Sequence, residues 1–207
     1  MSQTKILLDS NAYFRLAESI HPLLQTEFGT ERYCLYVIRE LQAEYDKNPR
    51  LRNAFSWVNE PAYKKNRVCE LNISRKNQQE IAQVFDFIKN HSKDSHPGLS
   101  RVDVTALAHA YVLAIPIVTD DSDMLELAQD FNIKTLKTLA LLKLMLDCHH
   151  IDIPVVRQIA SYWIYARMIS QSHSQRITKS CSRNRRPNNR IAIMMVKVSI
   201  PYCEINI

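Results

Sequence analysis

The sequence predicts an α/β fold: a three-layer sandwich with a mainly parallel central sheet of four to five strands. Short apolar runs alternate along the chain with longer stretches that carry apolar residues at helical spacing. The stretches between the apolar runs are too long for hairpins, which favours crossovers between parallel strands. A chain of 207 residues that is 46% hydrophobic is also long enough to bury a substantial core in one such domain.

The first half of the chain contains five predicted segments: a strand at about 5–9, a helix over 12–20, a helix over 33–45, short helices within 46–67 and a strand over 67–73. The apolar spacing of the second helix places Glu40 and Glu44 near its flank. The segment 46–67 is basic and aromatic, and we expect Pro49 and Pro61 to break it into short helices.

The second half continues the alternation with a helix over 76–90, a loop at 96–98, a helix over 100–113, a strand at 115–119, a helix at about 123–130, a strand at about 133–137, and helices over 139–146 and 154–168. These elements predict one domain over residues 1–150 and a closing C-terminal helix within 151–170. Residues 171–207 are rich in Ser, Asn and Arg, and we expect a poorly ordered tail there.

Charge and composition exclude several classes of protein. The net charge of +6 comes from the tail, where seven basic residues face one acidic residue. The five cysteines are scattered and never in CxxC spacing, which argues against a zinc site and predicts a reducing, cytoplasmic location. Only two glycines occur, so Gly-rich phosphate loops are excluded, and no apolar run approaches a membrane span.

Four acidic residues stand where a metal-dependent site would need them: Asp9, Glu40, Asp103 and Asp121. Asp9 ends the first apolar run, and Asp121 closely follows the run at 115–119. The carboxyl ends of buried parallel strands share one sheet edge, which is where open α/β folds bind ligands. Clustered carboxylates repel one another, so we expect a hard cation, Mg²⁺ or Mn²⁺, between them.

Each of these acids lies in a distinctive segment. In 7–11 an Asp is followed by small hydroxyl and amide residues, and in 117–123 a Thr precedes an Asp-x-Asp pair. The segments 37–41 and 99–108 place Glu40 and Asp103 in predicted helices. In this order, over residues 5 to about 150, the four segments resemble the PIN-domain nucleases, especially the ribonuclease toxins of prokaryotic toxin–antitoxin pairs.

The resemblance implies a Rossmann-like PIN fold and a metal-dependent endoribonuclease that acts in the cytoplasm. It implies that the catalytic residues and metal ligands are Asp9, Glu40, Asp103 and Asp121, that Asp123 is a further ligand, and that Ser10, Asn11 and Thr119 orient carboxylates or the attacking water. The implied partners are an RNA substrate, a neutralising antitoxin protein and a second copy of the chain, with 46–67 as the expected contact segment. No membrane association is implied.

Each acid also has a simpler interpretation as a structural residue. Asp9 could cap the helix that follows it, and Asp103 lies three residues after Ser100, the spacing of a capping box. Asp123 and Glu126 repeat that spacing at the next helix. Glu40 could be a solvated helix residue, as we expect of Glu44. Caps alone do not explain why acids gather at one sheet edge.

Two other functions fit parts of the pattern. A haloacid-dehalogenase-like phosphatase would use Asp9 with Asp120 and Asp121, but Asn11 stands where that chemistry wants a second Asp as general acid. A non-catalytic PIN-like module would bind RNA or a protein without cleaving it. The aromatic residues of 46–67 could stack on RNA, but we favour their packing against the domain.

Overall fold

Four parallel strands form the central sheet of the domain. The computed structural model describes residues 3–67 and 71–164, which belong to the unit Met1–Tyr165. The strands are β1 (Thr4–Leu8), β2 (Tyr33–Tyr36), β3 (Ile117–Val118) and β4 (Thr135–Leu136), in the spatial order β2-β1-β3-β4. The predicted α/β class with a parallel sheet is therefore confirmed, and the predicted tail 171–207 lies outside the described residues.

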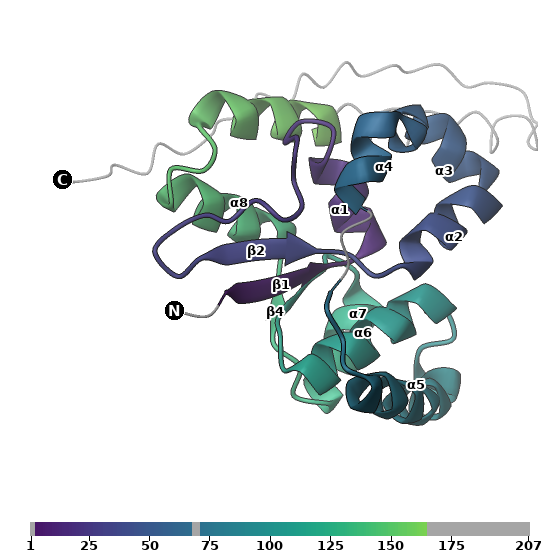
Figure 1. The fold of residues 1–207 in the computed structure, drawn as a ribbon. Coiled ribbons are helices and arrows are strands. Elements are labelled where there is room, and N and C mark those ends of the chain that lie inside the picture. The colour runs from purple at the N-terminus through teal and green to yellow at the C-terminus, as the bar shows by residue number, and fades with distance from the viewer. Residues whose placement is uncertain (1–2, 68–70, 165–207) are drawn as a thin grey trace, which may run out of the picture. The chain divides into compact units, whose positions relative to one another are not determined.

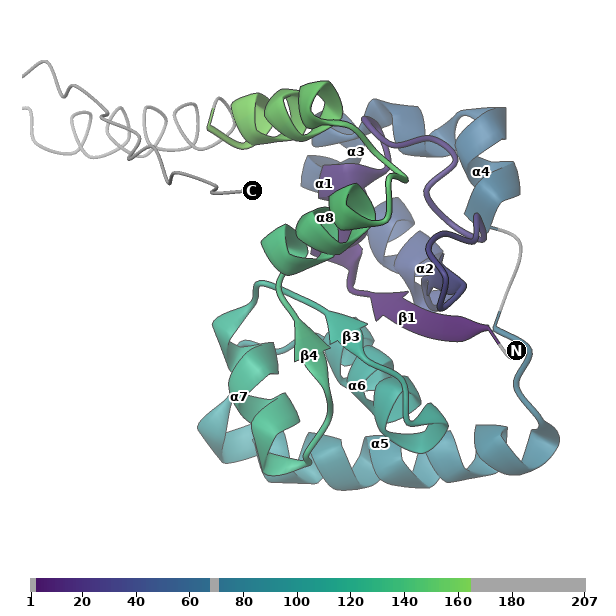
Figure 2. The same ribbon diagram turned by 90° about the vertical axis from the view of Figure 1, so that its left-hand side faces the viewer.

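Helices cover both faces of this sheet (Figures 1 and 2). On one face lie α1 (Ser10–Leu16), α2 (Glu40–Lys47), α3 (Pro49–Ala54), a 3₁₀ turn (Ser56–Asn59), α4 (Pro61–Arg67) and α8 (Thr138–Asp147). On the other lie α5 (Arg75–Ser95), α6 (Arg101–Leu113) and α7 (Ser122–Asp130). Residues 153–164 are also helical. No helix among the described residues is long and apolar enough to span a membrane.

Successive side chains along each strand point to opposite faces of the sheet, which divides the interior into two apolar clusters. Ile6 and Leu8 of β1 pack in the cluster beneath α1 and α8, whereas Leu7 packs in the cluster beneath α6 and α7. Val118 and Ile117 of β3 divide in the same way. All five side chains are almost completely buried, because a parallel sheet covered on both faces exposes neither set.

Two predicted segments differ in the structure. The predicted helix over 33–45 is a strand, β2, followed by α2 from Glu40. A short apolar run fits a buried strand as well as a helix, and pairing with β1 decides for the strand. The predicted strand over 67–73 is wrong where it can be seen, because Arg67 ends α4 and residues 71–73 are irregular.

The segment 46–67 packs against the domain through its aromatic side chains. Phe55 stacks on Phe14 of α1 with ring centroids 5.1 Å apart, and Trp57 is 8% exposed. This confirms packing rather than an exposed aromatic surface for these rings. The expected division into short helices is confirmed, with Pro49 and Pro61 at the first positions of α3 and α4, where no backbone donor is needed.

Gly29 lies in a turn that leaves no room for a side chain. Its φ of +69° is in the left-handed region, and a Cβ there would lie 2.7 Å from Sγ of Cys148. We expect Gly29→Ala to lower the free energy of unfolding by about 1–3 kcal/mol, measured by denaturant titration. Gly98→Ala is the matched control, since its Cβ would approach Asp123 Oδ2 no closer than 3.3 Å. Equal stability of the two variants would contradict this account of Gly29.

Candidate active site

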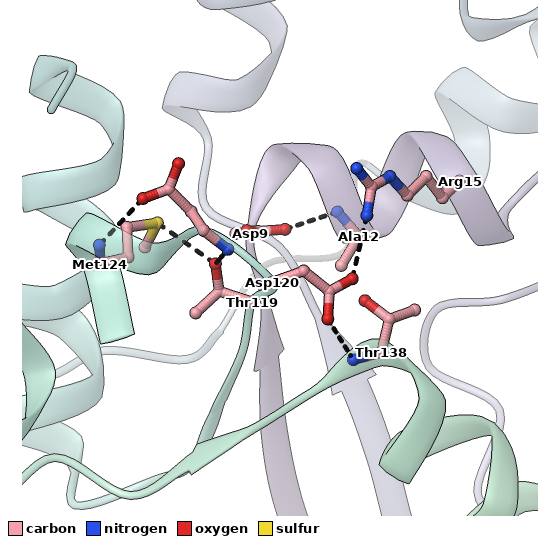
Figure 3. Close-up of polar contacts among 8 residues, drawn as sticks. Asp9, Ala12, Arg15, Thr119, Asp120, Met124 and Thr138 are labelled. Carbon is pink, nitrogen blue, oxygen red and sulfur yellow. Dashed lines mark hydrogen bonds and ion pairs between the residues drawn. The ribbon is translucent and has the colours of Figure 1, made fainter. Parts of the chain in front are cut away.

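The candidate site lies at the carboxyl edge of the sheet, between β1 and β3. The chain leaves β1 for β2 on one side and returns to β3 on the other, so the direction of winding reverses between these two strands. Such a switch point opens a crevice in α/β folds. Asp9 follows β1 and donates its backbone N–H to the Val118 carbonyl of β3 at 3.0 Å. Thr119, the next residue after Val118, therefore lies close to Asp9 (Figure 3).

Three of the predicted acids cap helices that begin at or near this edge. Asp9 accepts a hydrogen bond from the Ala12 N–H at the start of α1, and Asp121 accepts one from Met124 at the start of α7. Asp103 and Ser100 form a capping box on α6. The capping interpretation of Asp9 and Asp103 is therefore confirmed, whereas the cap of α7 is Asp121 rather than Asp123.

A carboxylate that caps a helix can also bind a metal ion. Each cap is made through one oxygen: Oδ1 of Asp9, Oδ2 of Asp103 and Oδ1 of Asp121. A carboxylate has two oxygens and about four acceptor sites, so capping and metal ligation are compatible. Helix N-termini carry partial positive charge, which helps to hold several acids at one edge.

Asp9 is the most unusual of these residues. It is 3% exposed, and its Oδ2 is buried without a hydrogen-bond partner among the described residues. Burial raises the pKa of Asp9 to about 6, and the charge of Asp103 adds to this rise. The Thr119 hydroxyl, the Ala12 N–H and the Arg15 guanidinium oppose it. A buried carboxylate oxygen without a partner is costly unless a ligand completes it.

Glu44, and not Glu40, joins this group. Ser10 donates its hydroxyl to Oε2 of Glu44 at 2.6 Å. Burial raises the pKa of Glu44, the Ser10 hydrogen bond opposes the rise, and the charge of Asp103 adds to it. Glu40, one helical turn earlier, is exposed. The expectation that Glu44 is merely solvated is therefore wrong, because Glu44 is half-buried and bonded to Ser10, whereas the role of Glu40 stays a prediction.

The supporting residues are placed unequally. Ser10 is buried and Thr119 is fully buried, and the Thr119 hydroxyl oxygen accepts the Asp121 N–H at 3.1 Å. The same hydroxyl lies 3.5 Å from Sδ of Met124 (Figure 3), and its proximity to Asp9 lowers the pKa of that residue. Asn11 is exposed. Ser10 and Thr119 are thus in position to orient the acids, and Asn11 has no described contact that does so.

The sequence did not point to Arg15, which lies beside the acids. Its Nη1 donates to Oδ2 of Asp120 at 2.9 Å, while Oδ1 of Asp120 accepts the Thr138 N–H at 3.1 Å (Figure 3). Both oxygens of Asp120 are therefore bound to protein groups. This separates it from Asp121, the next residue, which caps α7 through Oδ1.

Within the described part of the chain, no three His, Cys, Asp or Glu side chains are placed to hold one metal ion together. The Asp123 carboxylate lies against Gly98 of the loop between α5 and α6. Mg²⁺ dehydrates reluctantly and is commonly held by only one or two direct carboxylates plus several waters. Of the acids described above, Asp9 is the one with a buried carboxylate oxygen to which no described residue donates a hydrogen bond.

No protein-family model and no curated protein matches this chain. Among solved structures, the crystal structure of FitAcB from Neisseria gonorrhoeae is similar to it, with a TM-score of 0.42 and 15% sequence identity. The aligned region covers 65% of this chain and 98% of that one. A likeness at this level is distant.

Proposed function

We propose that this protein is a divalent-metal-dependent endoribonuclease that hydrolyses RNA phosphodiester bonds. The observation that carries the proposal is Oδ2 of Asp9, a buried carboxylate oxygen at the switch point of a parallel sheet to which none of the residues in 3–67 and 71–164 donates a hydrogen bond. The charge of Asp103 adds to the electrostatic cost of ionising Asp9 and does not relieve it. A hard cation would reverse that cost, since it favours the ionised form of every carboxylate around it.

The ion would be Mg²⁺ or Mn²⁺, with Asp9 as direct ligand and Asp103, Glu44 and Asp121 reaching it directly or through water. When bound, such an ion polarises the scissile phosphate of the RNA and lowers the pKa of a bound water. The residues of the chain hold and orient it. Ser10 fixes the Glu44 carboxylate, and Thr119 holds the backbone of Asp121 next to Asp9.

We further propose that the protein acts as a toxin and is neutralised by an antitoxin protein. The order of the acidic segments supports this through its resemblance to the PIN-domain toxins. The cations Lys47, Arg50, Arg52, Lys64 and Lys65 are exposed on a segment whose aromatic side chains are packed inward. A basic surface of this kind suits an acidic partner peptide, and a second copy of the chain is the competing occupant.

Chelation separates this proposal from its rivals. We expect the purified protein to cleave single-stranded RNA with Mg²⁺ or Mn²⁺ and to lose this activity completely in excess chelator, with recovery when the metal is restored. A small phosphomonoester should not be hydrolysed, because Asn11 cannot act as the general acid of a phosphatase. Cleavage that survives chelation would refute the proposal, and retention of intact RNA would favour a binding module.

A further inference from the structure

A cleft of about 950 Å³ opens beside the candidate site, between α2 and the start of α3 on one wall and α5 with α6 on the other. Two residues of the site line it. Glu44 accepts the hydrogen bond from Ser10, and Ser100 shares the capping box with Asp103. The cleft therefore borders the candidate site at Glu44 and Ser100, and a molecule bound at Glu44 can extend into it.

An aromatic ring lies in this cleft with cations around it. The guanidinium carbon of Arg101 is 5.5 Å from the centroid of the Phe85 ring, and Nζ of Lys89 is 5.7 Å from the same centroid. Ile81 and Val102 add apolar lining. Unpaired bases stack on aromatic rings and guanidinium planes in proteins that bind single-stranded nucleic acids.

The charges of the residues that line the cleft favour a neutral base over a negatively charged phosphate. The ionisable residues are Glu40, Glu44, Asp86, Lys47, Arg101 and His109. Carboxylates outnumber the Lys and Arg side chains, so the lining does not favour a run of negatively charged phosphates. Bases are neutral, and their amino groups donate hydrogen bonds to carboxylates.

We propose that this cleft binds an unpaired base of single-stranded RNA next to the bond that is cleaved, stacked on Phe85 and Arg101. The inference rests on the proposed function, because it takes the acid cluster as the place of cleavage. The position of Glu44 in the lining and the ring–guanidinium pair favour RNA over an amphipathic peptide.

Binding without cleavage tests the proposal. Fluorescence anisotropy of labelled single-stranded RNA of about ten nucleotides, in excess chelator, measures affinity when metal-dependent turnover is impossible. We expect Phe85→Leu to weaken binding about tenfold and Arg101→Lys, which keeps the charge but loses the planar group, to weaken it several-fold. The slope of affinity against salt should not change in Phe85→Leu, because no phosphate contact is lost.

Phe87→Leu is the matched control. Phe87 lies on the same helix, is 67% exposed and packs against Phe131 outside the cleft, so this variant should bind like wild type. Equal binding by Phe85→Leu and wild type would overturn the proposal, as would equal weakening by Phe85→Leu and Phe87→Leu. Wild-type protein that binds no RNA would also overturn it and would leave the cleft to a protein partner.

Cleavage assays on the same variants separate the two proposals. If the nuclease proposal fails alone, RNA still binds through Phe85 but is not cleaved when Mg²⁺ is added. If the cleft proposal fails alone, chelator-sensitive cleavage persists and Phe85→Leu leaves KM unchanged. If both hold, Phe85→Leu raises KM about tenfold, with a smaller effect on kcat.

Discussion

Asp9→Asn is expected to lower metal-dependent RNA cleavage about a thousandfold while the protein stays folded. The amide keeps the shape of the side chain and can still accept the Ala12 N–H, since Asn caps a helix about as well as Asp. It loses the negative charge that a hard cation requires. Initial rates on single-stranded RNA with Mg²⁺, at equal protein concentration, measure the effect.

The same substitution should stabilise the protein in a pH-dependent way. The pKa of Asp9 is raised from 3.8 to about 6 on burial, so its ionisation opposes folding. The penalty is absent below the unfolded pKa, grows as pH rises between the two values and is complete above the folded pKa. A shift of about two units corresponds to roughly 3 kcal/mol. We therefore expect Asp9→Asn to be more stable than wild type at about pH 8 and equally stable at about pH 4, by denaturant titration without metal.

Asp120→Asn provides the control at the same sheet edge. Arg15 and the Thr138 N–H occupy both oxygens of Asp120, so its charge supports an exposed ion pair rather than a ligand. We expect a loss of at most about 1 kcal/mol in stability and little loss of activity. Full cleavage by Asp9→Asn, or equal losses of activity in the two variants, would contradict the role assigned to Asp9.

The second large effect concerns two glutamates of α2. Glu44→Gln is expected to lower kcat about ten- to a hundredfold, because it removes the negative charge of a carboxylate that Ser10 holds beside Asp103. Glu40→Gln should leave kcat near the wild-type value, because Glu40 is exposed one turn away. The amide in Glu44→Gln still accepts the Ser10 hydroxyl, so both variants should fold. Steady-state kinetics with Mg²⁺ compares the two variants. A larger loss of kcat in Glu40→Gln than in Glu44→Gln would assign the role in the metal site to Glu40.

The fold follows from the sequence where local pattern and long-range pairing agree. The apolar runs that became β1 and β3 are short and end directly before the polar residues Asp9 and Thr119, and the segments that follow them have helical spacing. The strand β2 was missed because Tyr33–Tyr36 has no β-branched residue and continues into a segment of helical spacing. Its state is set by hydrogen bonds to β1, a contact between segments some thirty residues apart.

The candidate site was predictable to the same extent. Asp9 and Asp121 could be placed because strand ends and helix caps are local features of sequence. The choice between Glu40 and Glu44 depends on how α2 lies against Ser10 and Asp103, which periodicity within one helix does not determine. The position of Arg15 beside Asp120 and the cleft around Phe85 result from tertiary packing, so no sequence motif predicts them.

The central claim is that a divalent cation binds at Oδ2 of Asp9. Crystals of the protein soaked in Mn²⁺, with diffraction recorded near the manganese absorption edge, test this directly. We predict an anomalous peak bonded to Oδ2 of Asp9, with the carboxylates of Asp103, Glu44 and Asp121 around it, and no such peak in Asp9→Asn. A fully occupied Mn²⁺ bound elsewhere, with Asp9 uncoordinated, would contradict the claim.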